Sequence, residues 1–177
     1  MSNYVCKVAN RDELLKRWDY LVRIHPNNNS WVVFKENTIR NFDANNIIVY
    51  YGLLDDNIIC EMTAYIKPDA FIGDIEDSEG LYSDTMAYLA AFRTDKEYEG
   101  NGYFSKLYKY VENDLIERGY TELSLGVGPE AVRNILIYFH LGYTEYIKTT
   151  VEHDPPKNEF DIPKDEYVNF YKKVLKK

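Results

Sequence analysis

A short glycine-containing segment has the residue types that best define a chemistry. Gly100-Asn101-Gly102 follows an apolar run at residues 87–92, which is typical of a strand buried on both faces. Apolar residues then recur three and four positions apart, as on one face of a helix: Phe104, Leu107, Tyr108, Val111 and Leu115. Glycines at a helix start let unpaired backbone amides approach an anion, and the helix dipole favours negative charge there. The segment therefore predicts a phosphate or pyrophosphate site.

Two familiar glycine-rich motifs fit this segment poorly. A Walker loop needs a second glycine before its lysine and a hydroxyl residue after it, whereas Ser105-Lys106-Leu107 stands here. A dinucleotide fingerprint needs a third glycine in place of Ser105, and its ribose-binding acid ends a strand, whereas Glu122 would begin one. A nucleotide-binding module is therefore the weakest interpretation of this segment.

Residues 85–143 resemble the GNAT superfamily of acyl-CoA-dependent N-acetyltransferases. That family carries Arg/Gln-x-x-Gly-x-Gly/Ala after its fourth strand. In the aligned residues 99–104, Gly102 matches, Glu99 replaces the basic or amide residue, and Phe104 replaces the small residue. The family's last helix ends in Tyr-x-x-x-Gly-aromatic, and the matching residues are Tyr138, Gly142 and Tyr143. The order and separation of the two motifs carry the resemblance.

The resemblance implies acetyl-CoA as the co-substrate, with its pyrophosphate on the backbone amides of the loop and its pantetheine along the preceding strand end. The cofactor-binding residues expected on this basis are Phe92, Arg93, Thr94, Glu99, Gly100, Asn101, Gly102, Tyr103, Phe104, Ser105 and Asn134. For Asn134, an amide on the helix surface remains the alternative. Three scattered histidines and two distant cysteines give no metal-ligand spacing, so no metal is expected.

Two residues are candidates for proton transfer. Tyr138 aligns with the family's tyrosine that donates a proton to the CoA thiolate, and a phenol with a pKa of about 10 is a credible donor. Strand alternation puts Glu61 on one face with Thr63 and Tyr65. Glu61 is therefore our candidate for the base that takes the proton of the amine. The alternatives are a helix-face aromatic for Tyr138 and a surface carboxylate for Glu61.

Composition limits the partners of this chain. With 21 Lys and Arg against 29 Asp and Glu, the formal net charge is −8, which disfavours nucleic acid and anionic membranes and favours a cationic amine. Solubility is the alternative explanation of this acidic charge, and it carries more weight. The length of 177 residues predicts a single domain over residues 1–177. Cys6 and Cys60 form no CxxC motif, and no apolar run approaches membrane-spanning length, so a cytoplasmic location is expected.

The predicted elements position these residues in a GNAT-like order. Strands are expected at residues 4–8, 45–54, 58–67, 85–94, 121–127, 143–151 and 167–174, with a turn at Asp55-Asp56-Asn57. Helices are expected from Asn10 or Asp12, from Ser30, over 102–118 with a stop at Gly119, and from Gly128-Pro129 to Gly142. The resulting fold class is α/β (α+β), with a mixed, mostly antiparallel sheet of about six to seven strands and about four helices.

These features predict a cytoplasmic GNAT-type N-acetyltransferase that transfers an acetyl group from acetyl-CoA to a primary amine of a small molecule or peptide. The resemblance implies direct transfer in a ternary complex, and it makes a homodimer a candidate assembly. The alternative function is a non-catalytic acyl-CoA-binding or sensor domain, which Glu99 and Phe104 keep open. The acidic loop at residues 69–84 is expected either to border the substrate site or to be a solvated surface loop.

Overall fold

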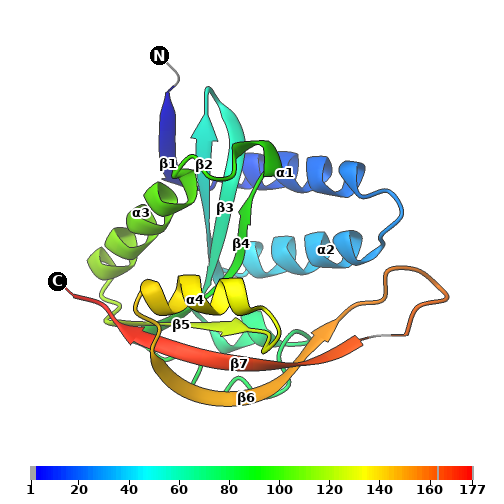
Figure 1. Cartoon of the computed structure of the whole chain (residues 1–177). Coiled ribbons are helices and arrows are strands. Elements are labelled where there is room, and N and C mark those ends of the chain that lie inside the picture. The colour runs from blue at the N-terminus through cyan, green and yellow to red at the C-terminus, as the bar shows by residue number, and fades with distance from the viewer. Residues whose placement is uncertain (1–2, 163, 177) are drawn as a thin grey trace.

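The computed structural model describes residues 3–162 and 164–176, which build a mixed sheet with helices on both faces (Figure 1). The strands are β1 (Tyr4–Val8), β2 (Ile47–Leu54), β3 (Asn57–Tyr65), β4 (Met86–Thr94), β5 (Glu122–Val127), β6 (Glu145–Asp154) and β7 (Lys164–Val174). The helices are α1 (Arg11–Ile24), α2 (Ser30–Asp43), α3 (Tyr103–Glu117) and α4 (Val132–His140), with 3-10 turns η1 (Pro68–Phe71) and η2 (Lys96–Tyr98). The predicted α/β fold class is confirmed.

The strand order is β1-β2-β3-β4-β5-β7-β6, and β4 and β5 form the parallel pair in an otherwise antiparallel sheet. A parallel pair needs a crossover connection, and α3 supplies it. The β4–β5 pairing ends at Leu89 and Leu125, although β4 continues to Thr94 and β5 to Val127. The sheet therefore opens between its two central strands, and Figure 1 shows β5, β7 and β6 crossing beneath the upright strands β1–β4.

A bulge in β4 lies at this opening. Between the pairs Thr63↔Ala90 and Glu61↔Arg93, β4 has one residue more than β3. Ala91, inside the bulge, has a φ of 55°, a left-handed conformation that is rare for a residue with a Cβ. A bulge leaves the backbone groups of its extra residue outside the ladder and re-aims the neighbouring side chains. These backbone groups are therefore available at the point where β4 leaves β5.

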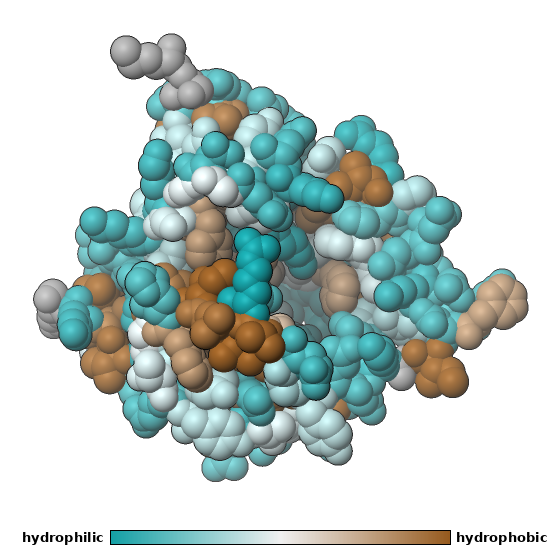
Figure 2. All heavy atoms as spheres, viewed as in Figure 1, coloured by the Kyte–Doolittle hydropathy of each residue, from teal (hydrophilic) through white to brown (hydrophobic). Residues whose placement is uncertain are grey.

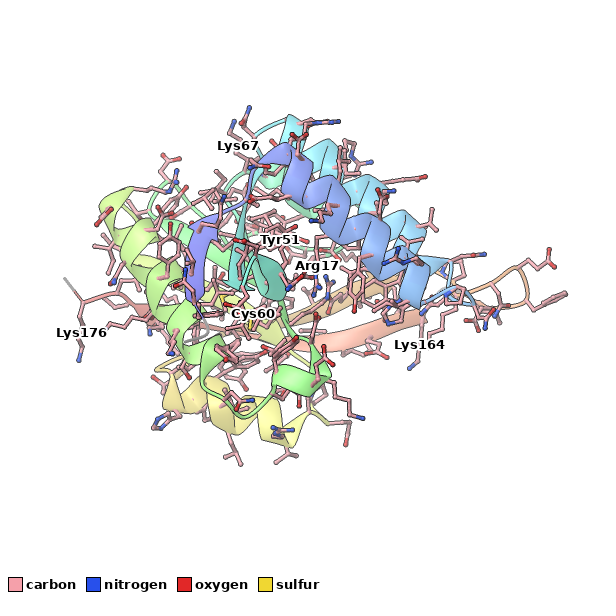
Figure 3. The ribbon with its side chains drawn as sticks, turned by 90° about the horizontal axis from the view of Figure 1, so that it is seen from above. Arg17, Tyr51, Cys60, Lys67, Lys164 and Lys176 are labelled. Carbon is pink, nitrogen blue, oxygen red and sulfur yellow. The ribbon has the colours of Figure 1, made fainter. Side chains whose placement is uncertain are left out.

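The two faces of the sheet have separate cores. Helix α3 packs Leu107, Val111 and Leu115 against one face, together with Met62 and Leu89 of the sheet. Helix α1 packs Leu14, Trp18 and Leu21 against the other face, where Val49 and Tyr51 lie. Figure 3 shows α1 and α2 together on one side of the sheet and α3 on the other side. The alternation predicted for β3 is confirmed, because Cys60, Met62 and Ala64 all belong to the α3 core.

Local capping and turn signals account for several element ends. The side chain of Asn10 accepts a hydrogen bond from the Glu13 amide at 2.9 Å, and the Glu13 carboxylate accepts one from the Asn10 amide at 3.0 Å. This capping box fixes the start of α1 at Asn10 rather than at Asp12. The hairpin between β2 and β3 turns at Asp55 and Asp56, both with positive φ, as the sequence predicted.

Other element ends differ from the sequence predictions. Ser30 does not cap α2, because its hydroxyl donates to the Pro155 carbonyl at 2.9 Å and Asn29 occupies the N-cap position. Helix α4 begins at Val132 rather than at Gly128-Pro129, because the Ala131 amide donates to the Gly128 carbonyl and closes a turn first. Strands β6 and β7 are longer than predicted, since they pair with each other as far as Asp154↔Lys164.

Candidate active site

The loop between β4 and α3 presents a run of unpaired backbone amides. Gly100 and Gly102 have φ values of 76° and 77°, and Gly102 is the N-cap of α3. A Cβ built on either glycine would meet no atom within 4 Å. Within the described part of the chain, no acceptor is hydrogen-bonded to the amides of residues 100–105. The loop therefore fits a diphosphate group, which needs open space and several converging N–H donors at a helix N-terminus.

The two departures from the family motif leave this loop open. The Phe104 ring turns toward the sheet and lies 6.0 Å from the Phe92 ring and 6.1 Å from the Tyr108 ring, centroid to centroid. Glu99 is exposed. A positive charge is also close, because the Lys106 ammonium lies 5.7 Å from the ring centroid of Tyr103. Phe104 therefore adds to the core and leaves the space in front of the amides free.

Tyr138 lies beside the opening in the sheet. Its ring is 5.5 Å from the Phe92 ring and 6.5 Å from the Tyr143 ring, centroid to centroid. Burial raises the pKa of Tyr138 above its usual value, so the hydroxyl stays protonated at neutral pH. The structure thus brings Phe92, Phe104 and Tyr138 together. Asn134 lies exposed on α4, one turn before Tyr138, and the Thr94 hydroxyl lies 3.3 Å from the Cys60 sulfur.

Glu61 occupies the opposite face of the sheet in a buried ion-pair network. One carboxylate oxygen accepts a hydrogen bond from Arg17 Nε at 2.7 Å, and the other accepts one from Arg93. Arg17 is 3% exposed and also donates to both oxygens of Asp95, at 2.7 and 3.1 Å. Figure 3 shows Arg17 close to Tyr51 in the middle of the molecule. This geometry favours a positioning role for Glu61 over the base role expected from the sequence, because both of its oxygens are engaged by guanidinium groups.

The side chain of Arg93 points to this second face and away from the glycine loop. Its guanidinium lies 5.4 Å from the ring centroid of Trp18 and 5.1 Å from that of Trp31. Arg93 therefore cannot offset the charge of Glu99, and only its backbone remains a candidate for contact with the cofactor. Glu61 and Arg93 form one unit, separate from the group around Tyr138.

A cavity of about 330 Å³ lies on the α1–α2 face. Its floor is formed by β2, β3 and the bulge of β4, including Tyr51, Glu61, Thr63 and Ala91. Apolar and polar side chains of α1 and α2 form one wall: Trp18, Val33, Phe34, Asn37, Thr38 and Asn41. The segment after η1 and the end of β6 form the other wall. Figure 2 shows the surface hollowed between the α4 region and the α1–α2 pair. The cavity and the glycine loop thus lie on opposite faces of the sheet, and the β4 bulge lies between them.

The second wall carries carboxylates that the sequence did not identify as functional. Asp74 accepts a hydrogen bond from the Tyr65 hydroxyl at 3.0 Å, and Glu152 lies on β6 beside it. Burial, and then the charge of Asp74, raise the pKa of Glu152 to about 7. The acidic loop thus borders the cavity through Ile72, Gly73 and Asp74. No local pattern indicated Glu152, because the pair Ile75↔Glu152 joins segments far apart in the sequence.

The described residues contain no group of three or more His, Cys, Asp or Glu side chains that could hold a metal ion. None of the described helices has the length and apolar character needed to cross a membrane.

Comparisons with known proteins agree with this arrangement. The candidate site therefore combines an open amide loop, a split parallel strand pair and a cavity on the opposite face. The sequence profile of the Acetyltransferase (GNAT) family matches residues 11–143. The chain belongs to this acetyltransferase family, and the resemblance found in the motifs is confirmed. No curated protein matches the sequence.

Solved structures show the same fold at low sequence identity. An N-acetyltransferase from Staphylococcus aureus Mu50 has a TM-score of 0.59 at 15% identity, covering 98% of this chain and 99% of that one. The ribosomal-protein-S18-alanine N-acetyltransferase from Escherichia coli has a TM-score of 0.62 at 12% identity, covering 99% of this chain and 96% of that one. The structure of yncA, a putative acetyltransferase from Salmonella typhimurium, with its cofactor acetyl-CoA has a TM-score of 0.62 at 12% identity, covering 98% of this chain and 95% of that one.

Proposed function

We propose that this protein transfers an acetyl group from acetyl-CoA to a primary amine, directly and within a ternary complex. The observation that carries the proposal is the opening between β4 and β5, with unpaired amides and Tyr138 on one side and an acid-lined cavity on the other. Direct transfer requires two substrates to meet in a fixed geometry, and a split sheet with a site on each face supplies it. A cytoplasmic location is part of the proposal, and the free thiols of Cys6 and Cys60 fit it.

The chain would hold acetyl-CoA through backbone groups. The amides of residues 100–105 would bind its pyrophosphate, and the end of β4, Phe92–Thr94, would lie along its pantetheine. When bound, this co-substrate supplies a thioester whose acetyl carbon is open to an amine. The bulge at Ala91 places free backbone groups beside that position, where they can bind the carbonyl oxygen as it gains negative charge.

Tyr138 is the proposed proton donor to the departing thiolate. It lies next to Phe92 at the opening, and its raised pKa keeps the phenol protonated at the pH of the reaction. Glu61 has a different proposed role: it holds the Arg93 guanidinium against the two tryptophan rings and so maintains the shape of the cavity. Acidic residues elsewhere in the cavity are left to receive the proton of the amine.

A Tyr138→Phe variant tests the proposal. Positioned proton donors contribute about 10²- to 10⁴-fold to rate, so we expect kcat to fall about 100-fold or more while the Kd for acetyl-CoA stays unchanged. Release of the free CoA thiol measures turnover, and calorimetric titration measures binding. Tyr146→Phe is the matched control, because Tyr146 is 55% exposed on β6. Full activity of Tyr138→Phe would contradict the assignment.

The sensor alternative makes a different prediction in the same experiment. A non-catalytic acyl-CoA-binding domain would bind acetyl-CoA and release no thiol with any amine of a broad panel. Failure to bind acetyl-CoA at millimolar concentration would contradict both functions. Thermal stability gives an independent readout, because a ligand that binds only the folded state raises it.

A further inference from the structure

We infer that the cavity on the α1–α2 face binds a small primary amine with one ammonium group and an apolar or aromatic body, and that Glu152 takes the proton of that ammonium. This inference rests on the proposed function. It adds the substrate class and a catalytic residue that neither the motifs nor the family match specifies.

The charge in the cavity is divided between its two ends. Glu61 is neutralised by Arg17 and Arg93, so that end carries no excess of negative charge. At the other end, no ion pair in the described part of the chain involves Asp74 or Glu152. His153, which also lines this wall, is paired with Asp165 at 2.8 Å. Two carboxylates that share a partly enclosed wall disfavour each other's ionisation. A single ammonium between them would relieve that repulsion and satisfy both.

A hydroxyl on a largely buried side chain, open to the cavity and without a partner in the described chain, also points to a ligand. Tyr51 is 1% exposed, yet its hydroxyl has no hydrogen-bond partner among the described residues. Every fully inaccessible side-chain N or O atom of these residues has a partner, so the Tyr51 hydroxyl must be open to the cavity that it lines. Thr63 is 7% exposed and also lines the cavity, and its hydroxyl likewise has no hydrogen-bond partner among the described residues. Native proteins rarely leave buried polar groups unpaired, so these hydroxyls mark the cavity as a place where a ligand or ordered water binds.

The remaining walls select the body of the amine. Apolar and aromatic side chains from α1, α2 and the sheet face the cavity: Trp18, Val33, Phe34, Ile47 and Val49. Asp154 also reaches the cavity; burial and the charge of Glu166 raise its pKa, although two nearby cations, Lys164 and Lys157, oppose that rise. A second ammonium on the ligand would therefore meet two lysines beside Asp154. The surface favours one cationic head and an apolar body over a polyamine or a charged peptide.

Glu152 is placed to serve the reacting amine. Burial, and then the charges of Glu152 and Asp74, raise the pKa of Tyr88, and Tyr138 adds to this shift. Tyr88 on β4 thus lies within electrostatic range of both Glu152 and the proposed proton donor. Ala91, the bulge residue, lines the same cavity as Glu152. An amine held by Glu152 and Asp74 therefore lies toward the opening in the sheet.

The transfer balances with these two residues. The Glu152 carboxylate takes one proton from the ammonium, which frees the nitrogen lone pair. The nitrogen forms a bond to the acetyl carbon, the carbon–sulfur bond breaks, and Tyr138 gives its proton to the sulfur. The second proton lost by the nitrogen restores the phenol, and Glu152 releases its proton to solvent. One ammonium and one thioester become one amide, one thiol and one proton.

The test uses the whole purified protein and 2-phenylethylamine, with the neutral 2-phenylethanol as the matched ligand. We expect calorimetric binding of the amine at least tenfold tighter than that of the alcohol, with or without acetyl-CoA. Thiol release should favour 2-phenylethylamine over spermidine and over the dipeptide Ala-Ala by tenfold or more in kcat/KM. Equal binding of the alcohol, or a preference for either of the other amines, would overturn the substrate class.

Variants separate the two acids. Glu152→Gln should lower kcat at pH 8 about 100-fold with the KM for acetyl-CoA unchanged, and Asp74→Asn should raise the KM for the amine about tenfold with kcat changed less than threefold. Glu145→Gln, an exposed acid on the same strand, should change neither quantity. Wild-type kcat in Glu152→Gln would overturn its role. If the protein bound the amine but not acetyl-CoA, the cavity would still be an amine site, and the proposed acetyl transfer would be contradicted instead.

Discussion

Glu61 is a buried carboxylate whose proposed role is to organise the site without reacting in it. It is 4% exposed and joins Arg17 of α1 to Arg93 of β4. Removal of one partner from a buried ion pair costs about 3 to 5 kcal/mol, because the remaining charge is left without compensation. We therefore expect Glu61→Gln to lower the free energy of unfolding by about 3 kcal/mol and kcat at pH 8 by no more than about tenfold. Urea unfolding and thiol release measure the two quantities.

An exposed ion pair gives the matched control for this prediction. Arg11 and Asp43 are joined at 2.8 Å, but their side chains are 53% and 44% exposed. Exposed pairs contribute about 0 to 1 kcal/mol, so Asp43→Asn should change stability by less than about 1 kcal/mol. Unchanged stability of Glu61→Gln together with a loss of kcat of about 100-fold or more would restore the base role predicted from the sequence.

The sequence indicated the face of β3 on which Glu61 lies but not its partners. Strand alternation is a local property, and the face was predicted correctly. Arg17 lies 44 positions earlier, on a helix that also buries Leu14, Trp18 and Leu21. Spacing alone gives no reason to bury an arginine among them. Burial of Arg17 depends on the pairing of three segments that come together only in the folded chain.

At the scale of elements, the proposed binding of a diphosphate depends on the start of α3. Gly102 has a φ of 77° and open space where a Cβ would lie. In Gly102→Ala, the left-handed backbone is expected to cost about 1 kcal/mol, and the methyl group would enter the space in front of the amides. We expect the Kd for acetyl-CoA to rise at least about tenfold, measured by calorimetric titration.

The other end of the same helix provides the control. Gly119 has a φ of 98° and likewise no atom within 4 Å of a built Cβ. Gly119→Ala should therefore lose a similar stability of about 1 kcal/mol and leave acetyl-CoA binding unchanged. Equal affinity in the two variants would show that the loop does not hold the co-substrate.

Element ends were predictable where their cause is local. The capping box at Asn10, the turn at Asp55 and Asp56, and the stop at Gly119 each depend on residues within a few positions. The ends of β6 and β7 depend on the pairing of these strands with each other, and the sequence predicted both strands to be shorter than they are. The cavity also depends on residues far apart in the sequence. Asp74 and Glu152 come together because Ile75 pairs with Glu152 of β6, and no local sequence pattern predicts that pairing.

At the scale of the whole molecule, the sheet separates two sites of opposite character. The α3 side offers backbone donors to an anion, and the α1–α2 side offers carboxylates to a cation. The net charge of −8 would repel an anionic co-substrate in general, so local donors at the helix N-terminus have to overcome it. The same net charge favours the approach of a cationic amine to the opposite face.

The acidic wall should also set how the stability of the molecule depends on pH. Glu152 has a raised pKa of about 7 in the folded chain against 4.5 unfolded, and it faces Asp74 on the loop, Asp154 on its own strand and Glu166 on β7. Between these pH values the folded chain binds the proton more tightly, so stability falls as pH rises from 4.5 to 7 and stays reduced above that. Glu152→Gln removes this loss. We therefore expect the variant to gain about 1 to 3 kcal/mol over wild type at pH 8 and little at pH 4.5, measured by urea unfolding at each pH. Glu145→Gln should follow wild type throughout, and a constant difference between Glu152→Gln and wild type across pH would contradict the buried, unpaired state of Glu152.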